Sequence, residues 1–173
     1  MPETTPILRC LTLDAHWAWA VREGMKAVEN RKRGVKSAEG KTIAHEQTPG
    51  GWVLDVPFFL AVHAGMKWDA DADFLPRCRD DLAFGHIGCI VRVRSWVDRR
   101  LADHGTLHKL AEQYGRWLEP VTARPVALDL TDLHKLERPV VATGAQGLWL
   151  PSADVRAEIL AQLPVGHLLR GEA

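Results

Sequence analysis

The chain has 173 residues, of which 46% are hydrophobic and 25% are charged, which is typical of one globular domain with a sizeable core. Its 22 lysines and arginines balance its 22 aspartates and glutamates, so no net charge draws it to nucleic acid or to an anionic membrane, and electrostatic recognition must be local. Three cysteines without a C-x-x-C pair indicate neither a disulfide framework nor a thiolate zinc site. The sequence shows no secretory signal and no apolar run near the roughly 20 residues of a membrane-spanning helix, so we expect a cytoplasmic protein without a membrane partner.

The first part of the chain is predicted to form a strand, a helix and a second strand. Residues 11–13 favour a short strand, and Asp14 is placed to cap the helix that follows. Trp17 lies on the helix face expected to point into the core, and Gly24 suits the left-handed conformation that ends a helix. Residues 26–31 then alternate as a strand that begins directly after the helix.

Residues 34–51 are polar and rich in glycine, without clear periodicity, which predicts a long loop inserted within a single domain of residues 1–173. The apolar run at 56–65 predicts a central strand. Further strands and two helices are predicted after it, with the strands at 85–97, 124–130, 138–144 and 147–151 and the helices at 106–114, capped by Thr106, and at 151–164, capped by Ser152. Short strands joined by irregular segments, with helices at the edges, predict an α+β fold built on a small mixed β-barrel.

Four segments occur in a characteristic order: LTLDAHWAWAVREGMKAVENR at 11–31, FFLAVHAG at 58–65, GHIGCIVRV at 85–93 and RPVVATGAQGLW at 138–149. In the first, a tryptophan-bearing helix leads into G-x-K-x-x-E-N-R. Together they resemble the ASCH family, a branch of the PUA-like β-barrel superfamily associated with RNA and modified nucleosides. The resemblance implies a PUA-like barrel with peripheral helices over the whole chain and a cleft that receives RNA or a nucleotide.

Some members of the family resemble amidohydrolases that deacylate acetylated cytidine with a lysine, a threonine three residues later and a distant glutamate. Lys26 matches the lysine, but Glu29 stands where the threonine is expected, so that hydroxyl nucleophile is absent. Other members look like ribonucleases. The resemblance therefore implies either a binding module or a hydrolase.

The charged residues from Lys26 to Arg33 allow a functional and a structural interpretation. Lys26 and Glu29 either face one cleft, where the carboxylate holds the ammonium, or form a salt-bridged corner that contributes about 0 to 1 kcal/mol if exposed. Asn30 either reads base edges through hydrogen bonds or satisfies the end of a strand. Arg31 and Arg33 open a basic stretch that either follows a phosphate backbone or forms a solvated face.

The aromatic and histidine residues also allow two interpretations. Trp17 either stacks on a base or fills the core. His63, at the end of the apolar strand, is either an acid or base near the cleft or a structural histidine with satisfied hydrogen bonds. His104 and His108 have a spacing that suits a metal on a helix, but no third ligand is indicated, so we predict neither a metal nor a cofactor.

The favoured function is a module that binds RNA, a nucleotide or a nucleoside in a cationic cleft. Its predicted ligand-binding residues are Trp17, Lys26, Glu29, Asn30, Arg31 and Arg33. The alternative is a hydrolase acting on RNA or on an acylated or modified nucleoside, with Lys26, Glu29 and His63 in the active site. The sequence shows no complete set of nucleophile and base, so turnover stays open, as does the oligomeric state.

Overall fold

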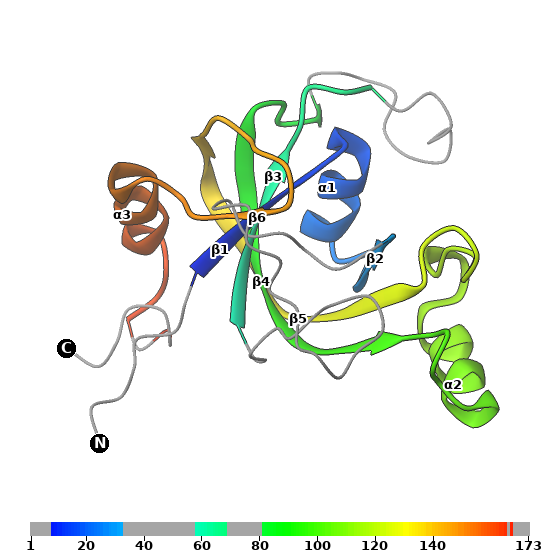
Figure 1. Cartoon of the computed structure of the whole chain (residues 1–173). Coiled ribbons are helices and arrows are strands. Elements are labelled where there is room, and N and C mark those ends of the chain that lie inside the picture. Colours follow the sequence, from blue (N-terminus) through cyan, green and yellow to red (C-terminus); the bar gives the residue numbers. More distant parts are fainter. Residues whose placement is uncertain (1–7, 33–57, 69–80, 166, 168–173) are drawn as a thin grey trace.

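The fold rests on a mixed sheet of six strands that curls into a half-barrel (Figure 1). The computed structural model describes residues 8–32, 58–68, 81–165 and 167. In chain order the strands are β1 (Leu8–Leu13), β2 (Val28–Arg31), β3 (Phe58–Ala64), β4 (His86–Asp98), β5 (Val126–Val141) and β6 (Leu148–Trp149). Their order in the sheet is β2-β5-β4-β3-β1-β6, with β1 and β3 parallel and the other neighbours antiparallel. The predicted α+β fold with a mixed, barrel-like sheet is confirmed.

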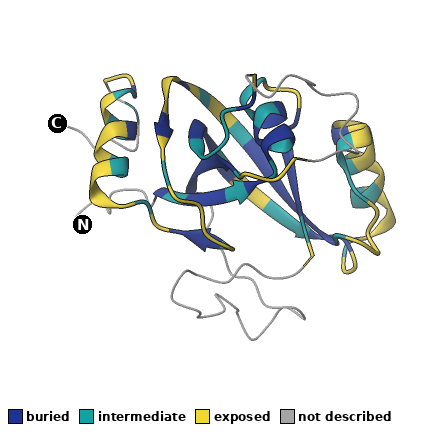
Figure 2. Ribbon diagram, turned by 90° about the horizontal axis from the view of Figure 1, so that it is seen from above, coloured by how far each residue is buried: buried dark blue, intermediate teal, exposed yellow. Residues whose placement is uncertain are grey.

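In the described part of the chain, three α-helices and a short 3₁₀ helix accompany the sheet. They are α1 (Ala15–Arg22), α2 (His104–Tyr114), η2 (Gly115–Trp117) and α3 (Ala153–Ala161). In Figure 1, α2 lies at the far end of the β4–β5 hairpin, away from α1 and α3. Figure 2 shows that α2 and α3 each present a largely exposed surface, whereas the strands between them are mostly buried.

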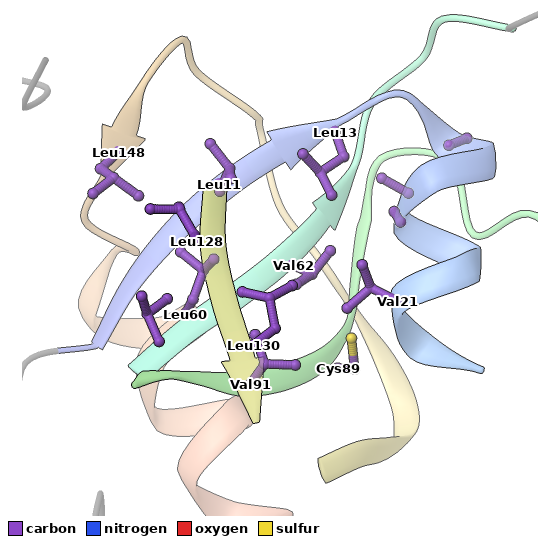
Figure 3. Close-up of a cluster of buried hydrophobic side chains, with 14 of the residues drawn as sticks. Leu11, Leu13, Val21, Leu60, Val62, Cys89, Val91, Leu128, Leu130 and Leu148 are labelled. Carbon is purple, nitrogen blue, oxygen red and sulfur yellow. The ribbon is translucent and has the colours of Figure 1, made fainter. Parts of the chain in front are cut away.

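Hydrophobic side chains cover both faces of the central strands. On β3, Leu60 and Val62 belong to a cluster that includes Val21 of α1, part of which Figure 3 shows. Phe59 and Ala61, which alternate with them along the strand, belong to a second cluster that includes Ile159 of α3. Because successive side chains of a strand face opposite sides, burial on both faces requires a continuous apolar run. The predicted central strand is confirmed over Phe58–Ala64, and residues 56 and 57 of the predicted range lie outside the described residues.

Two local features of the helices were predicted from single residues. Gly24 has φ of +73°, the left-handed conformation expected after α1, and the Ser152 side chain accepts a hydrogen bond from the backbone N–H of Val155 at the start of α3. Asp14 occupies the cap position of α1, but its side chain makes no capping hydrogen bond and instead accepts one from Lys67.

The structure corrects three predicted boundaries. The segments at 124–130 and 138–144 contribute to one strand, β5, because the polar residues between them also pair with β4. Backbone hydrogen bonds to β4 keep this middle part in the sheet although it has no apolar pattern. The cap of α2 is Asp103 rather than Thr106, since its carboxylate accepts from the backbone N–H of Thr106 at 2.9 Å. β2 begins at Val28, two residues after the predicted start at residue 26.

The predicted loop at 34–51 lies outside the described residues. Among the residues that the structure describes, no helix is long and apolar enough to span a membrane.

Candidate functional site

The corner between α1 and β2 brings Lys26 and Glu29 together. After Gly24, the backbone N–H groups of Met25 and Lys26 both donate to the carbonyl of Ala20, which turns the chain sharply towards β2. Lys26 Nζ then donates to Glu29 Oε2 at 2.7 Å and to the carbonyl oxygen of Val28. Only 5% of Lys26 and 4% of Glu29 are exposed, so the pair is buried within the corner.

Arg31 extends this ion pair towards solvent. Its Nη1 lies 3.5 Å from Glu29 Oε1, while Lys26 holds the other carboxylate oxygen. The Arg31 side chain is 23% exposed. Glu29 therefore neutralises one buried cation and orients a second, partly exposed one.

Asn30 points away from this ion pair and joins β2 to the η2 region. Its Nδ2 donates to the carbonyl oxygen of Trp117 at 2.7 Å, and its Oδ1 accepts from the backbone N–H of Glu119 at 3.3 Å. The residue is 1% exposed. The Asn30 amide therefore hydrogen-bonds the backbone next to the end of β2, as the structural interpretation of this residue predicts.

Trp17 is partly buried on α1. Its ring meets Trp117 edge to face, with ring centroids 6.3 Å apart, and packs against Ala20. Trp19 also packs against Ala20 in this group. Arg33, the remaining residue of the predicted binding set, lies outside the described residues.

A large hollow of about 820 Å³ opens between the edges of the half-barrel. Its described lining residues are Thr12, Arg31, His63, Gly65, Met66, Gly85 and the segment 142–147. A volume of this size accommodates a nucleotide, because small-molecule sites span roughly 300 to 1,000 Å³. Lys26 lines a different and smaller hollow of about 210 Å³, together with Gly24 and residues 130–133.

The structure thus divides the predicted site residues. Arg31 and His63 face the large hollow from two distant strands. Lys26 and Glu29 lie behind Arg31 and support it. Asn30 is engaged with the η2 region.

His63 is held in one tautomer at the floor of the hollow. Its Nε2 lies 3.0 Å from the carbonyl oxygen of Ala142, and because a carbonyl only accepts, Nε2 carries the proton. Burial lowers the pKa of His63 below its ordinary value, and backbone groups of Ala142 and Gly85 oppose that shift. The ring is therefore neutral near pH 7, and its Nδ1 presents a lone pair that has no hydrogen-bond partner among the described residues.

Two parts of the hollow were missed in the sequence. Thr12 lies beside His63 because β1 and β3 are parallel and these two residues are paired in register; its Oγ1 accepts from Trp149 Nε1 at 3.3 Å. The carboxyl ends of parallel strands meet at one edge of a sheet, so a polar residue at the end of each strand was the available signal. The 142–147 segment carried a second signal, since GAQG follows a strand and interrupts the apolar pattern.

Metal and thiol chemistry have little support among the described residues. No group of three His, Cys, Asp or Glu side chains there is arranged to hold a metal ion. Cys10 and Cys89 are buried, and burial raises the pKa of each thiol to about 12, so both are protonated and unreactive near pH 7.

Two crystal structures share this arrangement of strands and helices. Both are variants of an ASCH protein from Zymomonas mobilis, each 15% identical to this chain, with TM-scores of 0.50 and 0.52. The superpositions cover 91% and 89% of this chain and 96% of the other chain in each case. The chain has an ASCH-type fold. This confirms the fold predicted from the four segments at 11–31, 58–65, 85–93 and 138–149.

No protein-family model matches the sequence, and no curated protein matches it. At 15% identity, the likeness to the two solved structures concerns the ASCH-type fold alone.

Proposed function

We propose that the protein binds a nucleotide or a single-stranded RNA segment in the large hollow, with Arg31 contacting a phosphate group. The observation that carries the proposal is the position of Arg31, which lines a hollow of nucleotide size and is oriented from behind by Glu29. A guanidinium held in this way is suited to phosphate because its planar set of N–H donors matches two phosphate oxygens.

Charge balance within the corner favours an anionic ligand. Glu29 carries one negative charge, and among the described residues the cations within reach of its carboxylate are Lys26 and Arg31. Lys26 is buried and uses its ammonium on Glu29 and on the carbonyl of Val28. The excess positive charge therefore lies on the side of Arg31, the member of the trio that faces the hollow.

The segment 143–146, which also lines the hollow, supplies uncommitted polar groups. In the part of the chain that the structure describes, residues 143–146 make no hydrogen bond, and all four are exposed. Their backbone N–H groups, the Thr143 hydroxyl and the Gln146 amide are consequently available to a ligand. Successive backbone N–H groups in a loop form favourable environments for anions.

The test is a titration of fluorescently labelled single-stranded RNA and of nucleoside 5′-monophosphates at several salt concentrations. We expect the affinity to fall as salt rises, because binding releases counterions from the phosphates. Arg31→Gln should weaken binding about tenfold or more, since a charge-assisted hydrogen bond is lost. Arg156→Gln, which removes the same charge from α3, is the matched control and should bind as the wild type does. Equal binding by the wild type and Arg31→Gln would contradict the proposal.

A hydrolase acting on RNA or on an acylated or modified nucleoside is the second candidate, and one observation favours it. The unpartnered, neutral Nδ1 of His63 can accept a proton from water or from a ligand hydroxyl. In this case Lys26 and Glu29 would act through Arg31, because their own polar atoms are buried and paired. Product analysis of the same incubations by mass spectrometry tests the candidate, with His63→Phe expected to abolish any product.

A further inference from the structure

The hydrogen-bonding state of His63 is unusual for a buried side chain. The residue is 2% exposed, yet Nδ1 has no hydrogen-bond partner among the described residues. Buried polar atoms in native proteins are nearly always paired, and an unpaired one is a common sign of a ligand or of catalysis. The ring cannot turn to relieve this without breaking the bond from Nε2 to Ala142.

Thr12 places a second polar group next to this nitrogen. A Cβ atom built on Gly144 would lie 2.7 Å from both His63 Nδ1 and Thr12 Oγ1, so the two atoms flank the same point. Trp149 Nε1 can only donate, and it donates to Thr12 Oγ1, which leaves the hydroxyl hydrogen of Thr12 for another acceptor. The floor of the hollow therefore offers one acceptor and one donor side by side.

The backbone of Gly144 lies over both atoms in this structure. Contacts this short leave no room for a side chain at position 144, nor for a ligand atom between the loop and the imidazole. However, residues 143–146 make no hydrogen bond within the described part of the chain, so little holds the loop in place. A ligand that displaces Gly144 breaks no hydrogen bond and satisfies a buried nitrogen.

We propose that His63 and Thr12 read the edge of a nucleobase: Nδ1 accepts a hydrogen bond from an N–H of the base, the Thr12 hydroxyl donates to the adjacent ring nitrogen or carbonyl, and the 143–146 loop moves aside. The inference rests on the proposed function and specifies that the nucleobase is the part of the ligand that His63 and Thr12 recognise. An adjacent N–H donor and acceptor is the pattern on the Watson–Crick edge of every standard base. A phosphate does not fit this end of the hollow, because its oxygens would face the lone pair of Nδ1, whereas Arg31 suits it.

The first experiment compares the four ribonucleoside 5′-monophosphates with purine riboside 5′-monophosphate, whose base has no N–H on that edge. We expect the wild type to bind at least one standard nucleotide about tenfold more tightly than the analogue, the value of one good hydrogen bond to a buried acceptor. In His63→Phe, which keeps a ring of similar shape, the preference should disappear while binding of ribose 5-phosphate stays unchanged. A wild type that binds every standard nucleotide no better than the analogue overturns the inference.

A second measurement on the wild-type protein does not depend on whether the His63 variant folds. The nitrogen NMR resonance of His63 Nδ1 should shift on addition of the preferred nucleotide, because a lone pair that accepts a hydrogen bond changes its shielding. Purine riboside 5′-monophosphate should leave the resonance in place. A resonance that moves equally with both ligands contradicts base reading by His63.

Gly144→Ala tests the movement of the loop. The added methyl group would collide with His63 and Thr12, so the loop must move off them even without a ligand. In the wild type, only the fraction of molecules with an open loop can bind, which lowers the apparent affinity. Because the loop is already open in Gly144→Ala, we expect an affinity about three- to tenfold higher than that of the wild type. Weaker binding by a folded Gly144→Ala protein would show that the closed loop is the binding state and would overturn the proposed movement.

Failure of this inference is distinguishable from failure of the proposed function. If Arg31→Gln weakens binding of both the standard nucleotides and the analogue, the proposed function stands whatever the role of His63. If the wild type binds neither nucleotides nor RNA, both proposals are wrong.

Discussion

The charged corner at Lys26 and Glu29 differs from the part of the hollow formed by His63 and residues 143–146 in how its polar groups are paired. In the corner, the charges of Lys26 and Glu29 are buried, and each has a partner within hydrogen-bonding distance. In the hollow, His63 Nδ1 is buried without a partner among the described residues, and residues 143–146 make no hydrogen bond with the described residues. The first region is complete without a ligand, whereas the second gains hydrogen bonds only when something binds.

This difference in hydrogen-bond satisfaction distinguishes the two regions better than residue type does. A lysine and a glutamate are the more obvious catalytic candidates, but burial of a charge is tolerated only where a partner compensates for lost hydration, and here each compensates the other. Arg31 connects the two regions, because it contacts Glu29 on one side and lines the hollow on the other.

The largest expected effect comes from breaking the buried ion pair. Lys26→Met leaves the buried Glu29 carboxylate with Arg31, at 3.5 Å, as its one remaining cation among the described residues, so we expect the free energy of unfolding to fall by about 3 to 5 kcal/mol. Urea denaturation followed by circular dichroism measures the change. The control is Lys67→Met, which removes a solvent-exposed partner of Asp14 and should reduce stability by less than about 1 kcal/mol. If both variants lost a similarly small free energy of unfolding, the buried ion pair at the corner would be no more important for stability than an exposed one.

The next largest effect concerns Asn30, which belongs to the satisfied region. Asn30→Ala leaves the carbonyl of Trp117 and the N–H of Glu119 without their buried partner, and we expect a loss of about 2 kcal/mol in unfolding free energy. Binding of RNA by the folded variant should match that of the wild type. Weakened binding together with unchanged stability would instead make Asn30 a residue that reads bases.

A smaller effect is expected from the protonation of His63. Because burial lowers the pKa of His63 below 6.5, the unfolded chain takes up a proton at this residue before the folded protein does as the pH falls. The contribution of the neutral His63 side chain to the free energy of unfolding is therefore fully present above about pH 6.5. It is lost as the pH falls from there towards the lower pKa of His63 in the folded state. Denaturation curves for the wild type and His63→Phe between pH 7.5 and pH 5 test this, since only the wild type should show that part of the decline. Parallel curves for the two proteins would argue against a neutral, buried imidazole.

The smallest effect should come from the loop. Gln146→Ala removes an exposed side chain that makes no hydrogen bond with the described residues, so unfolding free energy should change by less than about 0.5 kcal/mol. Thermal melting monitored by fluorescence is sufficient to detect a larger change. A marked destabilisation would show that this loop, like the charged corner, depends on contacts of its polar side chains for stability.

Several elements of the fold followed from local patterns. The run at 56–65 predicted a central strand because a strand buried on both faces needs apolar residues at successive positions, and β3 has that environment. Gly24 predicted the end of α1, and Ser152 predicted the start of α3, since both depend on backbone chemistry within a few residues. β5 was divided in two because its middle is polar and is kept in the sheet only by pairing with β4.

The sequence by itself determined the charges at the corner, the apolar faces of the strands and the cap of α3, because each of these depends on neighbours close in the chain. Only the tertiary structure decided which polar groups are satisfied. Asn30 meets Trp117 across 87 positions, His63 meets Ala142 across 79, and Thr12 meets Trp149 across 137. A hydrogen bond needs its two atoms within about 3 Å, and a distance that short between remote residues is set by how the strands assemble.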